Sequence, residues 1–133
     1  MQLIVCLDDR DGMAFTHRRQ RRDSAVVADI LALAAGRPLW MTAQSAALFP
    51  ADAGVHVSEN PLAEAPDDAC CFMETGPLAP AAARLDRLTI YRWNRHYPAD
   101  VRFDLPLNGW RLVGTRDFAG HSHEKITRED RER

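Results

Sequence analysis

Residues 3–7, an uninterrupted apolar run, constrain the fold of this chain more than any other stretch. The run, Leu-Ile-Val-Cys-Leu, lacks the polar alternation of a half-exposed strand and ends at Asp8 and Asp9. Such a run predicts a strand that is buried on both faces, as in a parallel sheet with helices on either side. Ligands of open α/β sheets bind beyond the carboxyl ends of the strands, so we expect the binding site near the loop of residues 8–22. This loop has neither helical nor strand periodicity.

The size and composition of the chain exclude several classes of protein. A chain of 133 residues is long enough for one domain with its own core. No apolar run approaches the roughly 20 residues that cross a bilayer, and the start of the chain does not resemble a signal peptide, so we expect a soluble, cytoplasmic protein. Cys6, Cys70 and Cys71 fit neither a disulfide framework nor a zinc site, so we expect reduced, buried thiols and no metal. A net charge of -2 gives no general attraction to nucleic acid.

The middle of the chain alternates between helix and strand signals. Asp23 precedes apolar residues at three- and four-residue spacing, which predicts a helix that runs to about Ala35 and ends at Gly36. Thr42 or Ser45 is expected to cap a brief second helix. The remaining elements are predicted from short apolar runs and proline positions: strands at residues 38–41, 55–57, 70–73 and 88–93, a surface connection at 60–68 and a short helix at 80–85.

Beyond Pro98 the pattern changes to that of antiparallel strands. Apolar and polar residues alternate along residues 101–105, and residues 110–114 and 121–127 are two further strand candidates. Residues 128–133 alternate in charge sign, which is typical of a solvated tail. The sequence therefore predicts a single α/β domain of residues 1–127, with a mostly parallel sheet, flanking helices and a C-terminal antiparallel hairpin, followed by a charged tail.

Taken in order, these elements resemble the dihydrofolate reductase family. The first strand leads to Gly12 and Met13, where that family has a Gly-Ile or Gly-Met loop, and the following helix opens on the acidic Asp23. Residues 38–42, Pro-Leu-Trp-Met-Thr, are similar to the family's Pro-Val-Ile-Met-Gly strand and turn. Trp110 and residues 121–127 are similar to its closing hairpin. The resemblance implies a dihydrofolate reductase-like fold, a reductase activity and NADPH as the cofactor.

Departures from the family lie where its reductases hold the cofactor. Glu74 and Thr75 stand in place of a Gly-Gly pair, and a carboxylate there would repel phosphate. Thr42 and Ala43 stand in place of a Gly-Arg pair, which removes a positive charge. Residues 55–70 are also short for the strand and helix on the adenosine side. These departures disfavour NADPH and leave the identity of the cofactor open.

Asp23 and the arginines before it form the first candidate site. An aspartate at a helix start is a good N-cap, and by the resemblance Asp23 also matches the catalytic acidic residue that hydrogen-bonds the pterin ring and supports its protonation. Both roles stay open. Arg18, Arg19 and Arg22 lie just before the helix, where free N–H groups and the helix dipole favour anions. These arginines predict either a binding site for an anionic ligand or a solvated loop.

Further candidates lie at or near the ends of the predicted strands. Cys6 and Met41 are expected to line the same pocket as Asp23, because their strands end beside it. Trp93 is either a stacking platform or a core residue, and Arg95 beside it suits a planar anionic ligand. The pocket is thus predicted between the loop of residues 8–23 and the ends of these strands.

His121 and His123 stand two residues apart on an expected strand. Residues at this spacing face the same side of a strand, so the two imidazoles are candidates for acid–base chemistry. Without a third ligand at a recognisable spacing they do not predict a metal site.

Two hypotheses about function follow. The first is a dihydrofolate reductase-like protein that binds a small planar or anionic ligand of pterin or nucleotide type, either as a reductase or as a cofactor-free binding protein. The second is a nucleic-acid-processing or RNA-binding protein of ribonuclease type, which uses the run of residues 18–22 together with His121 and His123. A third possibility is a partner-binding subunit without a pocket of its own.

Overall fold

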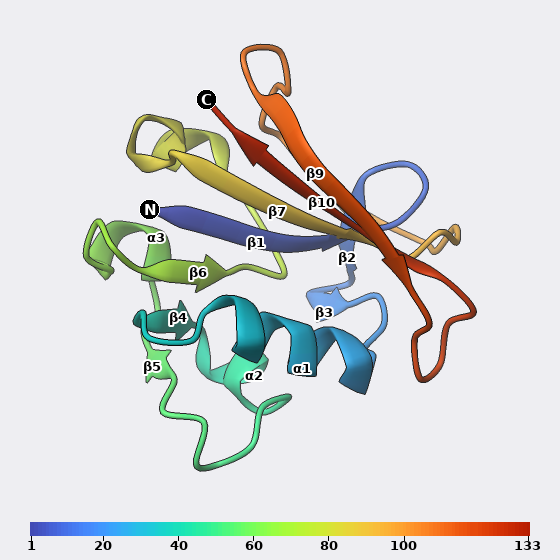
Figure 1. Ribbon diagram of the computed structural model, residues 1–133, viewed down its shortest axis with the longest axis horizontal. Coiled ribbons are helices and arrows are strands. Elements are labelled where there is room, and N and C mark those ends of the chain that lie inside the picture. The colour runs from blue at the N-terminus through green and yellow to red at the C-terminus, as the bar shows by residue number, and fades with distance from the viewer.

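The apolar run at the start of the chain forms the central strand of a seven-stranded sheet (Figure 1). The computed structural model describes residues 1–133. Strand β1 (Gln2–Leu7) pairs in parallel with β6 (Cys70–Phe72) and β7 (Arg87–Arg92). Beyond β6, the parallel strands β4 (Leu39–Met41) and β5 (His56–Val57) complete that side of the sheet.

An antiparallel hairpin completes the other side of the sheet. Strand β10 (Ile126–Glu132) pairs with β7, and β9 (Arg111–Phe118) pairs with β10 at the edge. The full order is β5-β4-β6-β1-β7-β10-β9. The predicted mostly parallel sheet with a C-terminal antiparallel hairpin is therefore confirmed.

The two faces of the sheet carry two hydrophobic cores. Ile4 packs with Val26 and Ile30 of helix α1 (Ser24–Leu33), whereas Leu3 and Val5 point to the opposite core. That opposite core is covered by α3 (Pro61–Glu64) and the 3-10 helix η1 (Ala79–Arg84). Strand β1 is thus buried on both faces, as its sequence predicts. None of the helices could span a membrane.

Helix α1 begins and ends close to the predicted positions. The side chain of Asp23 accepts a hydrogen bond from the backbone N–H of Ala25, which makes it the N-cap. Helix α1 ends at Leu33, with Ala34 as its C-cap, and Gly36 has a φ of 82° two residues later. Thr42 caps the short helix α2 (Ala43–Ala46).

The prediction that residues 8–22 form a loop without strands is wrong. Strands β2 (Gly12–Phe15) and β3 (Arg18–Arg19) form a hairpin, and β8 (Val101–Arg102) pairs with β2. The buried carboxylate of Asp8 organises this small sheet, because it accepts hydrogen bonds from Gly12 N at 2.7 Å and Gln20 Nε2 at 3.0 Å. Burial alone would raise the pKa of Asp8, but these bonds hold it below its usual value. Strand β2 also pairs with β8, far along the chain, and these partners, rather than a local periodicity, stabilise it.

The C-terminal residues also depart from their prediction. The segment at His121 and His123 is a turn, so these two side chains do not share a strand face, and β10 begins only at Ile126. Residues 128–132, predicted as part of a solvated tail, lie in β10 between β7 and β9. Their charges are neutralised within the fold, because Arg128 pairs with Asp29 of α1 at 3.0 Å and with Asp130 at 3.1 Å. Charge alternation here reflects internal ion pairs rather than solvation.

Two smaller predictions change as well. The expected surface connection of residues 60–68 contains helix α3, and the strand expected at 101–105 is reduced to β8.

Candidate functional site

A cleft opens beyond the carboxyl ends of β4 and β6, next to the β2–β3 hairpin. Its volume is about 260 Å³. The hairpin of β2 and β3 contributes His17, Arg18 and Arg19, and the opposite side carries Glu74 and Thr75. Its apolar lining comes from Ala14, Phe72 and Met73. The cleft therefore combines a basic side with one carboxylate and an apolar surface.

Hydrogen bonds among three side chains connect the two sides of the cleft. The Nε atom of Arg19 donates to Oε2 of Glu74 at 2.8 Å, and the Oγ atom of Ser45 donates to Oε1 at 2.7 Å. Arg19 also donates from Nη2 to the carbonyl oxygen of Gln44 at 2.7 Å. We call this group, Arg19, Glu74 and Ser45, the cross-cleft cluster. Because its members come from β3, α2 and the residues after β6, the cluster holds the hairpin against the sheet.

Arg18 differs from Arg19 in having no ion pair. Its side chain is exposed on the cleft wall beside His17 and makes no hydrogen bond within the protein. Arg18 is therefore free to contact a ligand, whereas Arg19 is already engaged.

A second groove of about 500 Å³ continues from the cleft and shares Thr42, Met73 and Thr75 with it. Arg84 is its one basic lining residue. The guanidinium of Arg84 donates to the carbonyl oxygens of Leu62 at 2.8 Å and Ala65 at 2.6 Å, and it pairs with Asp67. The positive charge in this groove is therefore used within the protein.

The first N–H groups of η1, beside the second groove, are also occupied. The carboxylate of Asp104 accepts from Leu78 N at 3.0 Å and from Ala79 N at 3.2 Å. Free N–H groups at such a terminus attract anions. Here Asp104 already supplies the anion.

Asp23 lies at the centre of a buried hydrogen-bond network. Besides capping α1, its carboxylate accepts from His121 N and Ser122 N, both at 2.8 Å, and from Nδ1 of His123 at 3.0 Å. Burial alone would raise the pKa of Asp23, but these donors hold it well below its usual value. The ionised carboxylate thus joins the start of α1 to the turn between β9 and β10.

His123 extends this network to the loop that follows β7. Its Nε2 atom lies 2.8 Å from the hydroxyl oxygen of Tyr97, and the ring of Trp93 stacks on it with centroids 4.6 Å apart. Because the Asp23 carboxylate only accepts, Nδ1 of a neutral His123 donates to it and Nε2 accepts from Tyr97. The side chains of His123 and Asp23 are 1% and 0% exposed, so the network has no open face.

The remaining predicted site residues lie in different environments. Met41 and Trp93 are core residues, and Cys6 is partly buried, with a thiol whose pKa is raised first by burial and then by the charges of Glu74 and Asp23. Arg95 is exposed, and its side chain forms no hydrogen bond or ion pair within the protein. Arg22 lines a separate depression of about 490 Å³ beside Asp23 and His121.

The structure thus brings Arg18 and Arg19 together in the cleft and places Arg22 with Asp23 outside it. Sequence reasoning singled out Glu74 as a charge that repels phosphate and Ser45 as a helix cap, but it did not identify them as partners of Arg19. The facing positions of β3, α2 and β6 depend on the whole sheet, so no local signal revealed the cluster.

An open α/β sheet with its cleft at the carboxyl ends of the strands defines a class of ligand-binding folds. No protein-family model and no curated protein sequence matches the chain. Among solved structures, the chain is similar to dihydrofolate reductase from Enterococcus faecalis complexed with NADP(H) and RAB-propyl, with a TM-score of 0.71 and 12% identity. The match covers 99% of this chain and 95% of that chain. The fold is therefore dihydrofolate reductase-like, which confirms the resemblance read from the sequence.

Proposed function

We propose that the protein binds a small anionic ligand of pterin or nucleotide type in the cleft between the β2–β3 hairpin and Glu74, without a nicotinamide cofactor. The observation that carries this proposal is the position of Arg18, an exposed arginine without an internal partner on the wall of the cleft. Arginine presents several N–H donors in a planar fork that suits phosphate and carboxylate groups. His17 beside it adds a second polar group.

The size of the cleft supports a small ligand. Ligand pockets usually enclose about 300–1,000 Å³, and the cleft has about 260 Å³. A small fused heterocycle with one charged group is of about this size. The neighbouring groove extends it for a ligand with a larger substituent.

The side chains around the cleft and the neighbouring groove do not suit the pyrophosphate of a dinucleotide. Glu74 contributes negative charge to the cleft. The guanidinium of Arg84 is already bound to carbonyl groups and to Asp67. The carboxylate of Asp104 already accepts from the N–H groups at the start of η1. A pyrophosphate needs free donors and positive charge. The residues of this chain therefore do not fit the cofactor that the fold family uses.

The network around Asp23 supports a structural role for this residue. Its carboxylate already accepts from backbone N–H groups on two elements and from His123. Donating a proton to a ligand requires contact with that ligand, and the side chain is 0% exposed. We therefore assign Asp23 to holding the hairpin turn against α1.

Isothermal titration with inorganic phosphate, mononucleotides, folate and NADPH tests the proposal. We expect saturable binding of a small phosphate- or carboxylate-bearing ligand and none of NADPH. Arg18→Ala should weaken that binding at least about tenfold, since a charged hydrogen bond is worth roughly 1.5–3 kcal/mol. Arg10→Ala, an exposed arginine outside the cleft, is the matched control. Binding that is equal in both variants, or no binding of any anion, would contradict the proposal.

A further inference from the structure

We propose that Glu74 recognises the ring of the ligand, and that the cleft takes a ring with two adjacent N–H donors, as on the amide edge of guanine, joined to an anionic group. This inference rests on the proposed function and names the ligand class of the same site. Glu74 is the one carboxylate that lines the cleft. A negatively charged side chain does not help to bind an anion, so the presence of Glu74 in the cleft needs a separate explanation.

The acceptor capacity of Glu74 exceeds what the protein uses. An ionised carboxylate has about four acceptor positions on its two oxygens. Arg19 occupies one on Oε2, and Ser45 occupies one on Oε1. One position remains on each oxygen, which is the arrangement that accepts two parallel N–H bonds.

The cross-cleft cluster also fixes the direction of this carboxylate. Arg19 approaches from β3 and Ser45 from α2, and the Ser45 side chain is buried. The hydrogen bonds from Arg19 and Ser45 already hold the Glu74 side chain before a ligand binds. It therefore loses little conformational freedom on binding, and its remaining acceptor positions are preorganised.

The surroundings favour a planar ring over another donor group. Phe72 and Met73 supply an apolar lining beside Glu74. A flat heterocycle buries its faces against such groups and keeps its polar edge for the carboxylate. An anionic group on the same ligand then reaches Arg18, whose charge compensates for the negative charge of that group.

Guanine nucleotides and pterin carboxylates share this chemistry, and two ligands that differ in a single amino group test it. Inosine 5′-monophosphate lacks only the 2-amino group of guanosine 5′-monophosphate. We expect titration calorimetry to give a preference for the guanine nucleotide of about tenfold, the usual effect of one charge-assisted hydrogen bond. A pterin carboxylate has the same edge and is the third ligand. Its affinity relative to guanosine 5′-monophosphate shows which of the two ligand classes the cleft takes.

The variant Glu74→Gln is expected to remove the preference between the two nucleotides, because an amide offers one acceptor and one donor where the carboxylate offers two acceptors. Loss of the charge frees Arg19, so absolute affinity for both nucleotides can rise, and the ratio is the decisive quantity. Glu59→Gln, in the neighbouring groove, is the matched control and should keep the preference.

The parent protein alone decides the inference if Glu74→Gln fails to fold. Equal affinity of the parent for the two nucleotides, or binding of other anions but neither nucleotide, overturns the role of Glu74 while the proposed function stands. Absence of any Arg18-dependent anion binding is a failure of the proposed function itself.

Discussion

The Nδ1 atom of His123 lies 3.0 Å from the Oδ2 atom of Asp23, although the two residues are 100 positions apart in the sequence. Each side chain is almost fully buried. The contact fastens the turn between β9 and β10 to the start of α1. Tyr97 adds the loop after β7 to the same network through its hydrogen bond with His123.

Removing the Asp23 carboxylate should destabilise the protein far more than loss of a helix cap. Asp23→Ala should cost at least about 3 kcal/mol of unfolding free energy, because the cap and several buried donors lose their acceptor together. Asp23→Asn should cost about 2 kcal/mol, since the NH₂ group of asparagine is itself a donor and would face N–H groups whose hydrogen bonds the carboxylate accepts. Urea unfolding measures both, with exposed Asp9→Asn as the control. Equal stability of all three variants would contradict the network.

The same network predicts how stability depends on pH. The pKa values of Asp23 and Asp8 are lowered in the folded protein, so both groups stabilise it above their unfolded pKa of about 3.9. This contribution is lost as the pH falls below that value towards the folded pKa values. The urea midpoint of the parent should therefore drop steeply below about pH 4. In Asp23→Asn the drop should be shallower, and parallel curves would exclude the carboxylate as the cause.

Two glycines provide a test of close packing around Asp23. A Cβ atom on Gly120 would lie 2.6 Å from Oδ2 of Asp23 and 2.8 Å from the carbonyl oxygen of His123. Gly120→Ala should therefore cost at least about 2 kcal/mol. A Cβ atom on Gly114 would meet only Oδ2 of Asp130, at 3.8 Å, so Gly114→Ala is the control and should change stability by less than about 1 kcal/mol. Thermal unfolding compares the two, and a similar cost for both would argue against the tight turn.

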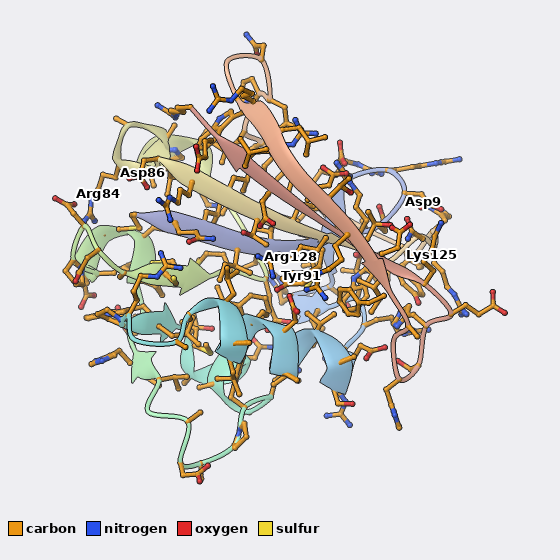
Figure 2. All side chains as sticks on the ribbon, in the orientation of Figure 1. Asp9, Arg84, Asp86, Tyr91, Lys125 and Arg128 are labelled. Carbon is orange, nitrogen blue, oxygen red and sulfur yellow. The ribbon has the colours of Figure 1, made fainter.

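Tyr91 and Arg128, labelled in Figure 2, form a second polar connection between the sheet and α1. Both bind Asp29 of α1. The Tyr91 hydroxyl donates to Asp29 at 2.6 Å, and burial followed by this contact raises the pKa of Tyr91. Tyr91→Phe should cost about 1–2 kcal/mol, because Oδ2 of the charged Asp29 loses one of its two donors and keeps only Arg128. In a Tyr97→Phe background, where Tyr91 is the one remaining tyrosine, tyrosinate absorbance should not appear before alkaline unfolding. A Tyr91 that ionises in the folded state would contradict this.

The elements that the sequence predicts are those whose signals are local. Residues 3–7 carry the composition of a strand buried on both faces, and Asp23 with Gly36 marks the limits of a helix within a few residues. The matching order of elements then favoured the dihydrofolate reductase-like fold that the structural similarity supports.

The features that the sequence did not reveal depend on distant partners. Strand β2 depends on the buried Asp8, whose carboxylate also accepts from Tyr97 N, far along the chain. Residues 128–132 have the composition of a surface tail because the partners of their charges, among them Asp29 and Arg92, lie on other elements. The role of Asp104 at the start of η1 has no local signal at all.

The position of β10 has a consequence for the order in which the protein is completed. Strand β9 is an edge strand whose sheet partner is β10, and β10 in turn separates it from β7. On the ribosome, β9 therefore emerges before the strand that attaches it to the rest of the domain. Until residues 126–132 follow, the β7 edge stays open to other extended chains, which is a known route to aggregation.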